Sequence, residues 1–219
     1  MTVMPARMFT AAINIGNPLD MASRLLVRVC DIARAYRLGG IDAQQASLVY
    51  SFLMSTTSNR SLRHMAWANQ RVYSSVLTLP EEALSSYLVN PEWTAGIILQ
   101  HIVNGADWFS YCLTQAPWTD IKIPLSMDDV DELASLLATL DKRIILQDEM
   151  PDIPMTINEE GQSWKAMRST ILVQAVHHAT EHRAQLIDAL EYQSFKPIIL
   201  DDIDLWAFER FERASPPSE

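Results

Sequence analysis

The sequence predicts an all-α protein, a single four-helix bundle with a short hairpin before its fourth helix and an extension at the N-terminus. In four long stretches, apolar residues recur every three or four positions, which is the spacing of a helix face that packs on a core. Only 6 of the 219 residues are glycines, and no glycine-rich phosphate-binding loop occurs, which argues against a doubly wound nucleotide-binding fold. Hydrophobic residues make up 48% and charged residues 20%, so the composition is that of a globular domain.

Residues 1–57 are predicted to be an extension outside the bundle, either helical or disordered. The spacing of apolar residues favours two helices there, at 21–38 and at 42–52. No apolar core precedes a small-residue cleavage site, so a secretory signal is not expected and the predicted location is the cytoplasm. Met54 is a second candidate translation start, and the extension is therefore either natural or an artefact of start-site choice.

Residues 58–212 are predicted to hold the bundle, and local signals mark the ends of its helices. The first helix ends before Pro80, whose ring cannot continue a helix. The second ends before a loop that contains Pro117 and Pro124. The third begins at Ser126, a capping residue followed by acidic residues that the helix dipole favours. The four helices are expected at residues 59–77, 94–114, 127–148 and 170–193.

Between the third and fourth helices, two short strands are expected at 155–157 and 162–164, with Gly161 near their turn. After the fourth helix, residues 204–211 are expected to form a short fifth helix, and residues 213–219 a disordered tail. Three side chains of the short helix are expected to pack on the end of the bundle: Leu205, Trp206 and Phe208.

Two histidines, His178 and His182, lie four residues apart on the predicted fourth helix. Four residues advance a helix by about 400° and roughly 6 Å, so both imidazoles lie on the same side, one turn apart. Their stripe is otherwise apolar and should face a core, where an unpaired polar group is costly. Either a metal ion or hydrogen bonds to backbone or carboxylate groups would satisfy both rings. The helical zinc motif of peptidases needs Glu directly after the first His, and Ala179 stands there instead.

A third ligand is expected from the second helix, because two histidines rarely hold a divalent ion tightly. His101 lies on a core stripe of that helix, and Gly105, one turn further on, would let another helix approach closely. His177 points about 100° away from His178, which favours a half-exposed position over a ligand. His64 lies on the more polar side of the first helix, where it would at most line the rim of the site.

Composition disfavours several classes of partner and site. The formal charge of −10 repels phosphate backbones, so nucleic-acid binding is not expected. No run reaches the roughly 18 apolar residues that a membrane span needs. Cys30 and Cys112 are the only cysteines, which excludes a disulfide framework and a cysteine-rich zinc motif. Cys112 lies roughly 16 Å along the helix from His101, too far to bind the same ion.

With these features the chain resembles the DinB family of metal-binding four-helix bundles. The resemblance covers about residues 58–211, and its elements occur in the family's order. The family usually has Gly after the His-Arg pair, where this chain has Ala184, a change that bears on packing more than on metal binding. Three segments carry the resemblance, residues 67–71, 99–102 and 178–185, together with Pro197 and residues 201–204 of the closing segment.

The resemblance implies an up-down-down-up bundle, often a homodimer, in which His101, His178 and His182 are the metal ligands. Three neutral imidazoles suit Zn²⁺, Ni²⁺ or Fe²⁺, and the ligand set does not choose among them. Three protein ligands also leave a coordination position open, as catalytic sites do.

Two functional classes follow. The first is a metal-dependent enzyme that acts on a small molecule, either a hydrolase or a transferase that uses a low-molecular-weight thiol. Resemblance to the thiol-transferase branches of the superfamily supports the transferase. The second class is a non-catalytic metal-binding protein of the stress response, whose ion mainly stabilises the bundle. A substrate-sized pocket beside the open position would favour the enzyme, and a buried, inaccessible ion the second class.

Overall fold

The structure, a computed structural model, describes residues 43–159 and 161–214. The chain divides into two compact units, residues 1–54 and 55–219, and the second contains every described element except the beginning of the first helix. The helix predicted at 21–38 lies outside the described residues.

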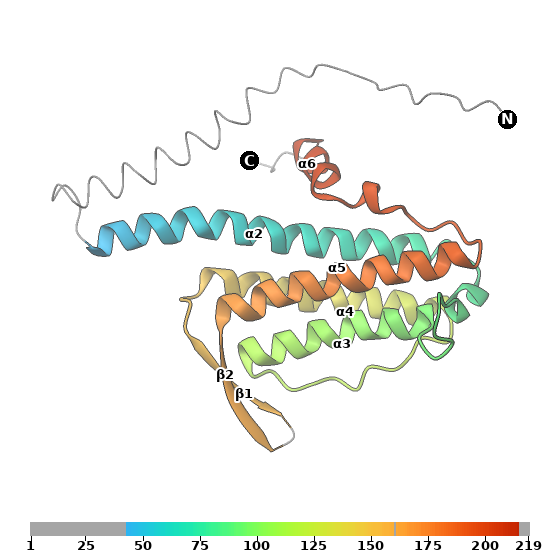
Figure 1. Ribbon diagram of the computed structural model, residues 1–219, viewed down its shortest axis with the longest axis horizontal. Coiled ribbons are helices and arrows are strands. Elements are labelled where there is room, and N and C mark those ends of the chain that lie inside the picture. The colour runs from blue at the N-terminus through green and yellow to red at the C-terminus, as the bar shows by residue number, and fades with distance from the viewer. Residues whose placement is uncertain (1–42, 160, 215–219) are drawn as a thin grey trace. The chain divides into compact units, whose positions relative to one another are not determined.

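Within the described residues the chain forms five α-helices and one two-stranded antiparallel sheet, so the predicted helical architecture with a hairpin is confirmed (Figure 1). The helices are α2 (Ala43–Val76), α3 (Ala95–Thr114), α4 (Met127–Leu146), α5 (Arg168–Tyr192) and α6 (Leu205–Ala214). The strands are β1 (Pro154–Glu159) and β2 (Gln162–Met167). None of the described helices is both long and apolar enough to cross a membrane.

Figure 1 shows α2, α3, α4 and α5 extending along one common direction, with α3 and α4 running opposite to α2 and α5. The loop after α3 runs back along that helix, so α4 starts at the end where α3 started. Backbone groups of the loop hold it there: the Ile121 carbonyl accepts from Gln100, and the Thr119 N–H donates to Asp107.

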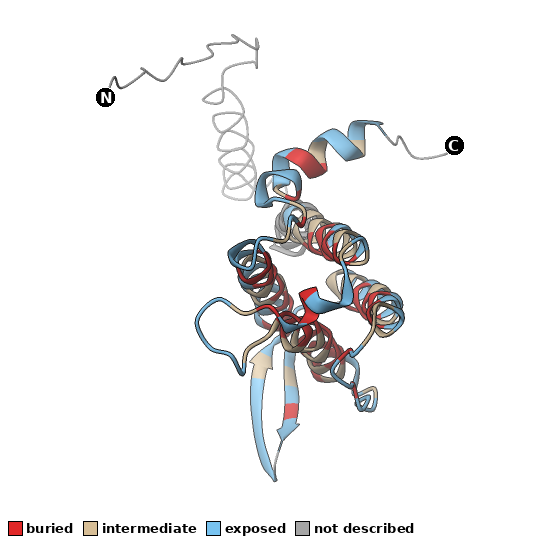
Figure 2. Ribbon diagram, turned by 90° about the vertical axis from the view of Figure 1, so that its right-hand side faces the viewer, coloured by how far each residue is buried: buried red, intermediate tan, exposed pale blue. Residues whose placement is uncertain are grey.

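Buried side chains fill the space between these four helices. Viewed along the helices, the buried residues lie on the sides that face one another (Figure 2). α3 packs on both α4 and α5. α2 adds buried apolar side chains to the same core, and its Tyr73 hydroxyl donates to the Leu99 carbonyl over 2.6 Å. α3 therefore contacts α2, α4 and α5, and these contacts fix the positions of its side chains.

Side chains cap the starts of α3 and α4, and the cap at Ser126 was predicted. The Thr94 side chain accepts from the Ile97 N–H at the start of α3. Ser126 and Asp129 form a reciprocal capping box at the start of α4, where each side chain accepts from the other's backbone N–H. The two strands pair from Pro154 opposite Met167 to Glu159 opposite Gln162, and Gly161, with a φ of +78°, lies in their turn.

Two predictions about the helices were wrong. A short helix at 42–52 and a separate first bundle helix from 59 were expected, but α2 runs unbroken from Ala43. No Gly or Pro occurs between residues 43 and 76, so nothing in the backbone interrupts it. In α6, Leu205 and Trp206 are 52% and 70% exposed, although they were expected to be packed. Phe208 is buried and contacts Trp67 of α2. A short helix packs only one of its faces on a neighbouring helix, so side chains on its other faces stay exposed.

Candidate metal centre

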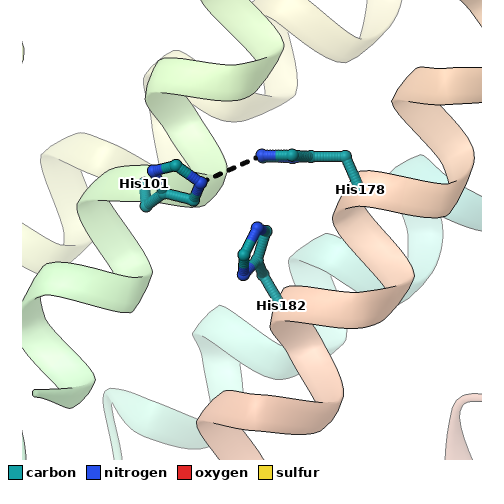
Figure 3. Close-up of side chains that lie close together, drawn as sticks. All are labelled: His101, His178 and His182. Atoms are coloured by element: carbon teal, nitrogen blue, oxygen red, sulfur yellow. Dashed lines mark hydrogen bonds between the residues drawn. The ribbon is translucent and has the colours of Figure 1, made fainter. Parts of the chain in front are cut away.

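His101 of α3 and the pair His178 and His182 of α5 lie together where the two helices pack (Figure 3). One ring nitrogen from each lies within 4.8 Å of the others. The Nε2 atoms of His101 and His178 are 3.1 Å apart and share a hydrogen bond. The ring centroid of His182 lies 4.4 Å from that of each partner. All three side chains are half-buried, so the cluster sits at the edge of the core and within reach of solvent.

The close approach of α5 to α3 at this level depends on Gly105. A β-carbon added to Gly105 would lie 2.6 Å from Nδ1 and 2.9 Å from Nε2 of His178. The His178 ring therefore occupies the space that any other residue's side chain would fill. Gly105 was predicted to let another helix approach closely, and the space that it leaves holds the His178 ring of α5.

The charge state of the rings suits a metal site. Burial, with smaller contributions from the neighbouring His182 and His101, lowers the pKa of His178 to about 4. Burial, with a smaller contribution from His182, also lowers the pKa of His101. Both rings are thus neutral near pH 7, and imidazole must be neutral to bind a metal.

The spacing of the nitrogens also fits one ion. Metal–nitrogen bonds of about 2.0–2.1 Å in a tetrahedral site place two ligand nitrogens roughly 3.3 Å apart. The 3.1 Å between His101 and His178 is close to that value. Side-chain rotation can close the remaining separations, which are at most 4.8 Å. The donor set and its geometry can therefore hold a divalent ion.

Aromatic rings flank the three histidines. The ring centroid of Trp93, just before α3, lies 5.2 Å from that of His101 and 5.9 Å from that of His182. Phe109 packs edge-on against His178 at 5.5 Å. The side-chain oxygen of Gln185 lies 2.9 Å from Nδ1 of His182 and 3.2 Å from Nε1 of Trp93. Sequence reasoning gave no role to Trp93 or Gln185, although Gln185 follows His182 at the three-residue spacing of one helix face.

Three buried polar side chains lie beneath the histidines, and the sequence reasoning missed them too. The Arg183 guanidinium donates to the Asn69 amide oxygen over 2.6 Å, and the Asn69 amide donates to Asp141 over 2.9 Å. These residues come from α5, α2 and α4. Burial raises the pKa of Asp141 to about 7, against the opposing effects of the Asn69 hydrogen bond and the Arg183 charge. Each residue is at most 2% exposed, so the group ties three helices together within the core.

A cavity of about 10 Å³ separates this polar group from the histidine cluster. Asn69, Asp141 and His178 line it together with apolar side chains. The second carboxylate oxygen of Asp141 is buried and has no hydrogen-bond partner among the described residues. The cavity has the size of one water molecule.

The other histidines and the described cysteine lie apart from the cluster. Nε2 of His64 is 2.7 Å from the Ile203 carbonyl, and its ring packs on Trp67 and Phe208. His177 is exposed on α5. Cys112 is buried, and burial raises the pKa of its thiol to about 12.

Comparison with known proteins supplies the family. The chain matches the DinB family over residues 54–203. No curated protein and no solved structure matched the chain in the corresponding searches. The match spans α3, α4, α5 and most of α2, including all three clustered histidines, and it confirms the resemblance inferred from the sequence: the chain belongs to the DinB family.

Proposed function

We propose that His101, His178 and His182 bind one divalent metal ion, Zn²⁺, Ni²⁺ or Fe²⁺, in a metal-dependent enzyme. The reaction is thiol-dependent transfer to or from a small molecule, or hydrolysis. The observation that carries the proposal is the convergence of three imidazoles from two helices within 4.8 Å, in a member of the DinB family.

The exposure of the site favours the enzyme over a purely structural ion. Each of the three histidines is half-buried, so a small molecule can approach the side of the cluster that the protein leaves uncovered. Structural metal sites are usually closed by a fourth protein ligand. Within the described residues, these three form the one group with a metal-ligand arrangement, and it contains no fourth member.

A bound divalent ion lowers the pKa of a coordinated water or thiol toward neutrality, which is how it supplies a nucleophile. The chain's own residues hold neutral nitrogen donors in place and cover the cluster with Trp93 on one side and Phe109 on another. Cys112 cannot serve as the thiol, because it is buried and its pKa is about 12. The transferase therefore requires a separate low-molecular-weight thiol.

One observation favours the second class, a non-catalytic metal-binding stress-response protein. The cavity beside His178 measures about 10 Å³, which is the size of one water molecule and too small for a substrate. Under this alternative, the ion would stabilise the packing of α3 on α5 without turning over a substrate.

The proposal includes the overall assembly that the family resemblance implies: an up-down-down-up four-helix bundle that forms a cytoplasmic homodimer. The opposite directions of α2 and α5 relative to α3 and α4 support the bundle order (Figure 1).

Cobalt substitution tests the site and the thiol reaction together. Co²⁺-loaded protein should show visible absorption that changes when a small thiol is added, because thiolate is a soft ligand for the open position. His182→Ala should abolish both the absorption and the change. His177→Ala, on the exposed side of the same helix, should preserve them. Absorption that no low-molecular-weight thiol alters would refute the transferase, and absence of Co²⁺ binding would refute the metal site.

A further inference from the structure

We propose that Gln185 and Trp93 form a clasp that positions His182 and fixes which of its ring nitrogens faces the other two histidines. This inference rests on the proposed metal site, which it extends to two residues outside the ligand set. The clasp consists of two hydrogen bonds to one atom, the Gln185 side-chain oxygen: 3.2 Å from Nε1 of Trp93 and 2.9 Å from Nδ1 of His182.

The Trp93 indole N–H can only donate a hydrogen bond, and this determines which ring nitrogen of His182 carries the proton. An indole N–H can donate a hydrogen bond but cannot accept one, so the Gln185 atom that faces Trp93 must be its carbonyl oxygen. That oxygen can only accept, so Nδ1 of His182 must carry the ring proton. Nε2 of a neutral His182 is then unprotonated, and its lone pair is free to bind a metal.

The ring orientation agrees with this assignment. In Figure 3 the His182 ring stands between the two helices, with one nitrogen directed toward His101 and His178. Nδ1 is occupied by Gln185, so the nitrogen that remains for the cluster is Nε2. The clasp thus holds the ring by its outer nitrogen and presents the inner one. Histidines that bind metals commonly need such a partner on the second nitrogen, and its loss typically weakens metal binding about 10–100-fold.

The clasp also connects the two helices that carry the ligands. Gln185 lies on α5, one turn beyond His182, and Trp93 directly precedes the N-cap of α3. The Trp93 ring makes an edge contact with the ring of His101 at 5.2 Å. Trp93 therefore touches one ligand with its ring and steadies a second through Gln185, so it sets the position of α3 relative to α5 at the cluster.

Four variants separate the clasp from general packing. Gln185→Ala removes the acceptor, and Gln185→Glu restores one of similar length. Trp93→Phe keeps an aromatic ring but removes the indole N–H. Gln174→Ala, an exposed glutamine earlier on α5, is the matched control.

The first measurement needs no metal. Long-range ¹H–¹⁵N spectra of histidine-labelled, metal-free protein report the tautomer of each ring. Wild type, Gln185→Glu and Gln174→Ala should show His182 protonated on Nδ1. Gln185→Ala should shift it toward a mixture of the two tautomers. A His182 ring that is protonated on Nε2 in wild type, or unchanged in Gln185→Ala, would overturn the clasp.

The second measurement is the dissociation constant for Co²⁺ from its visible absorption. Gln185→Ala should weaken binding about 10–100-fold, Trp93→Phe by a smaller factor, and Gln185→Glu should restore affinity to near the wild-type value. Equal affinity in wild type and Gln185→Ala would refute the positioning role while leaving the metal site intact. Wild-type protein that binds no Co²⁺ would refute the proposed function instead, and the tautomer measurement would then decide the clasp.

Discussion

Replacing Gly105 with alanine should separate metal binding from the stability of the helix that carries His101. The added β-carbon would lie 2.2 Å from Cε1 of His178, and ordinary contact begins at 3.4 Å, so the ring would have to move by about 1.2 Å, the difference between the two. Metal–nitrogen bonds vary by only about 0.2 Å around their usual length. A displacement of this size should remove His178 from the ligand set and leave two histidines.

The same substitution favours the helix itself. Alanine is better than glycine in a helix interior by about 1 kcal/mol, so the metal-free variant should be nearly as stable as wild type despite the displaced ring. With metal at about 100 times its dissociation constant, wild type should gain about 2.7 kcal/mol in the free energy of unfolding. Gly105→Ala should lose most of that gain. Urea unfolding with and without Zn²⁺ measures both effects.

Gly96→Ala provides the control on the same helix. Its added β-carbon would lie 3.3 Å from the Leu84 carbonyl oxygen and 3.5 Å from that of Pro124, and no histidine is among its nearest atoms. Metal should stabilise this variant as it does wild type. If Gly105→Ala gains as much stability from Zn²⁺ as Gly96→Ala, the inference that His178 fills the space above Gly105 and binds the ion there is wrong.

Three further predictions concern the core, the ion and the extension. Because the pKa of Asp141 is raised from 3.8 to about 7, its ionisation opposes folding as the pH rises through that window. Metal-free wild type should therefore lose about 1.4 kcal/mol per pH unit relative to Asp141→Asn between about pH 4 and 7, and parallel stability curves from urea unfolding would contradict this. A chelator should lower the melting temperature of wild type but not that of His178→Ala, as measured by circular dichroism. A chain that starts at Met54 should fold and bind Co²⁺ like the full chain, and loss of soluble helical protein would place the extension within the core.

Local chemistry in the sequence determined the helices and placed two of the three candidate ligands on one helix face. A helix repeats its geometry through hydrogen bonds between residues four apart, so the spacing of His178 and His182 alone put both rings on one face. Ser126 marked the start of its helix in the same way, because a cap involves only neighbouring residues. His101 was expected as the third ligand from its place on a core stripe of the second helix, and the resemblance to the DinB family supported it, but no local rule places it beside α5.

Contacts between side chains that are far apart in the sequence were determined only by the tertiary structure. Nothing in the sequence pairs Trp93 with Gln185, 92 residues further along the chain, or Asn69 with Asp141, 72 residues further along. The exposed face of α6 was likewise mispredicted, because apolar residues occur on several of its sides and the position of α2 selects one. The rotation and axial position of one helix against another depend on the simultaneous packing of many side chains that are distant in the sequence. Hydrogen bonds between near neighbours in the chain do not determine this rotation or position.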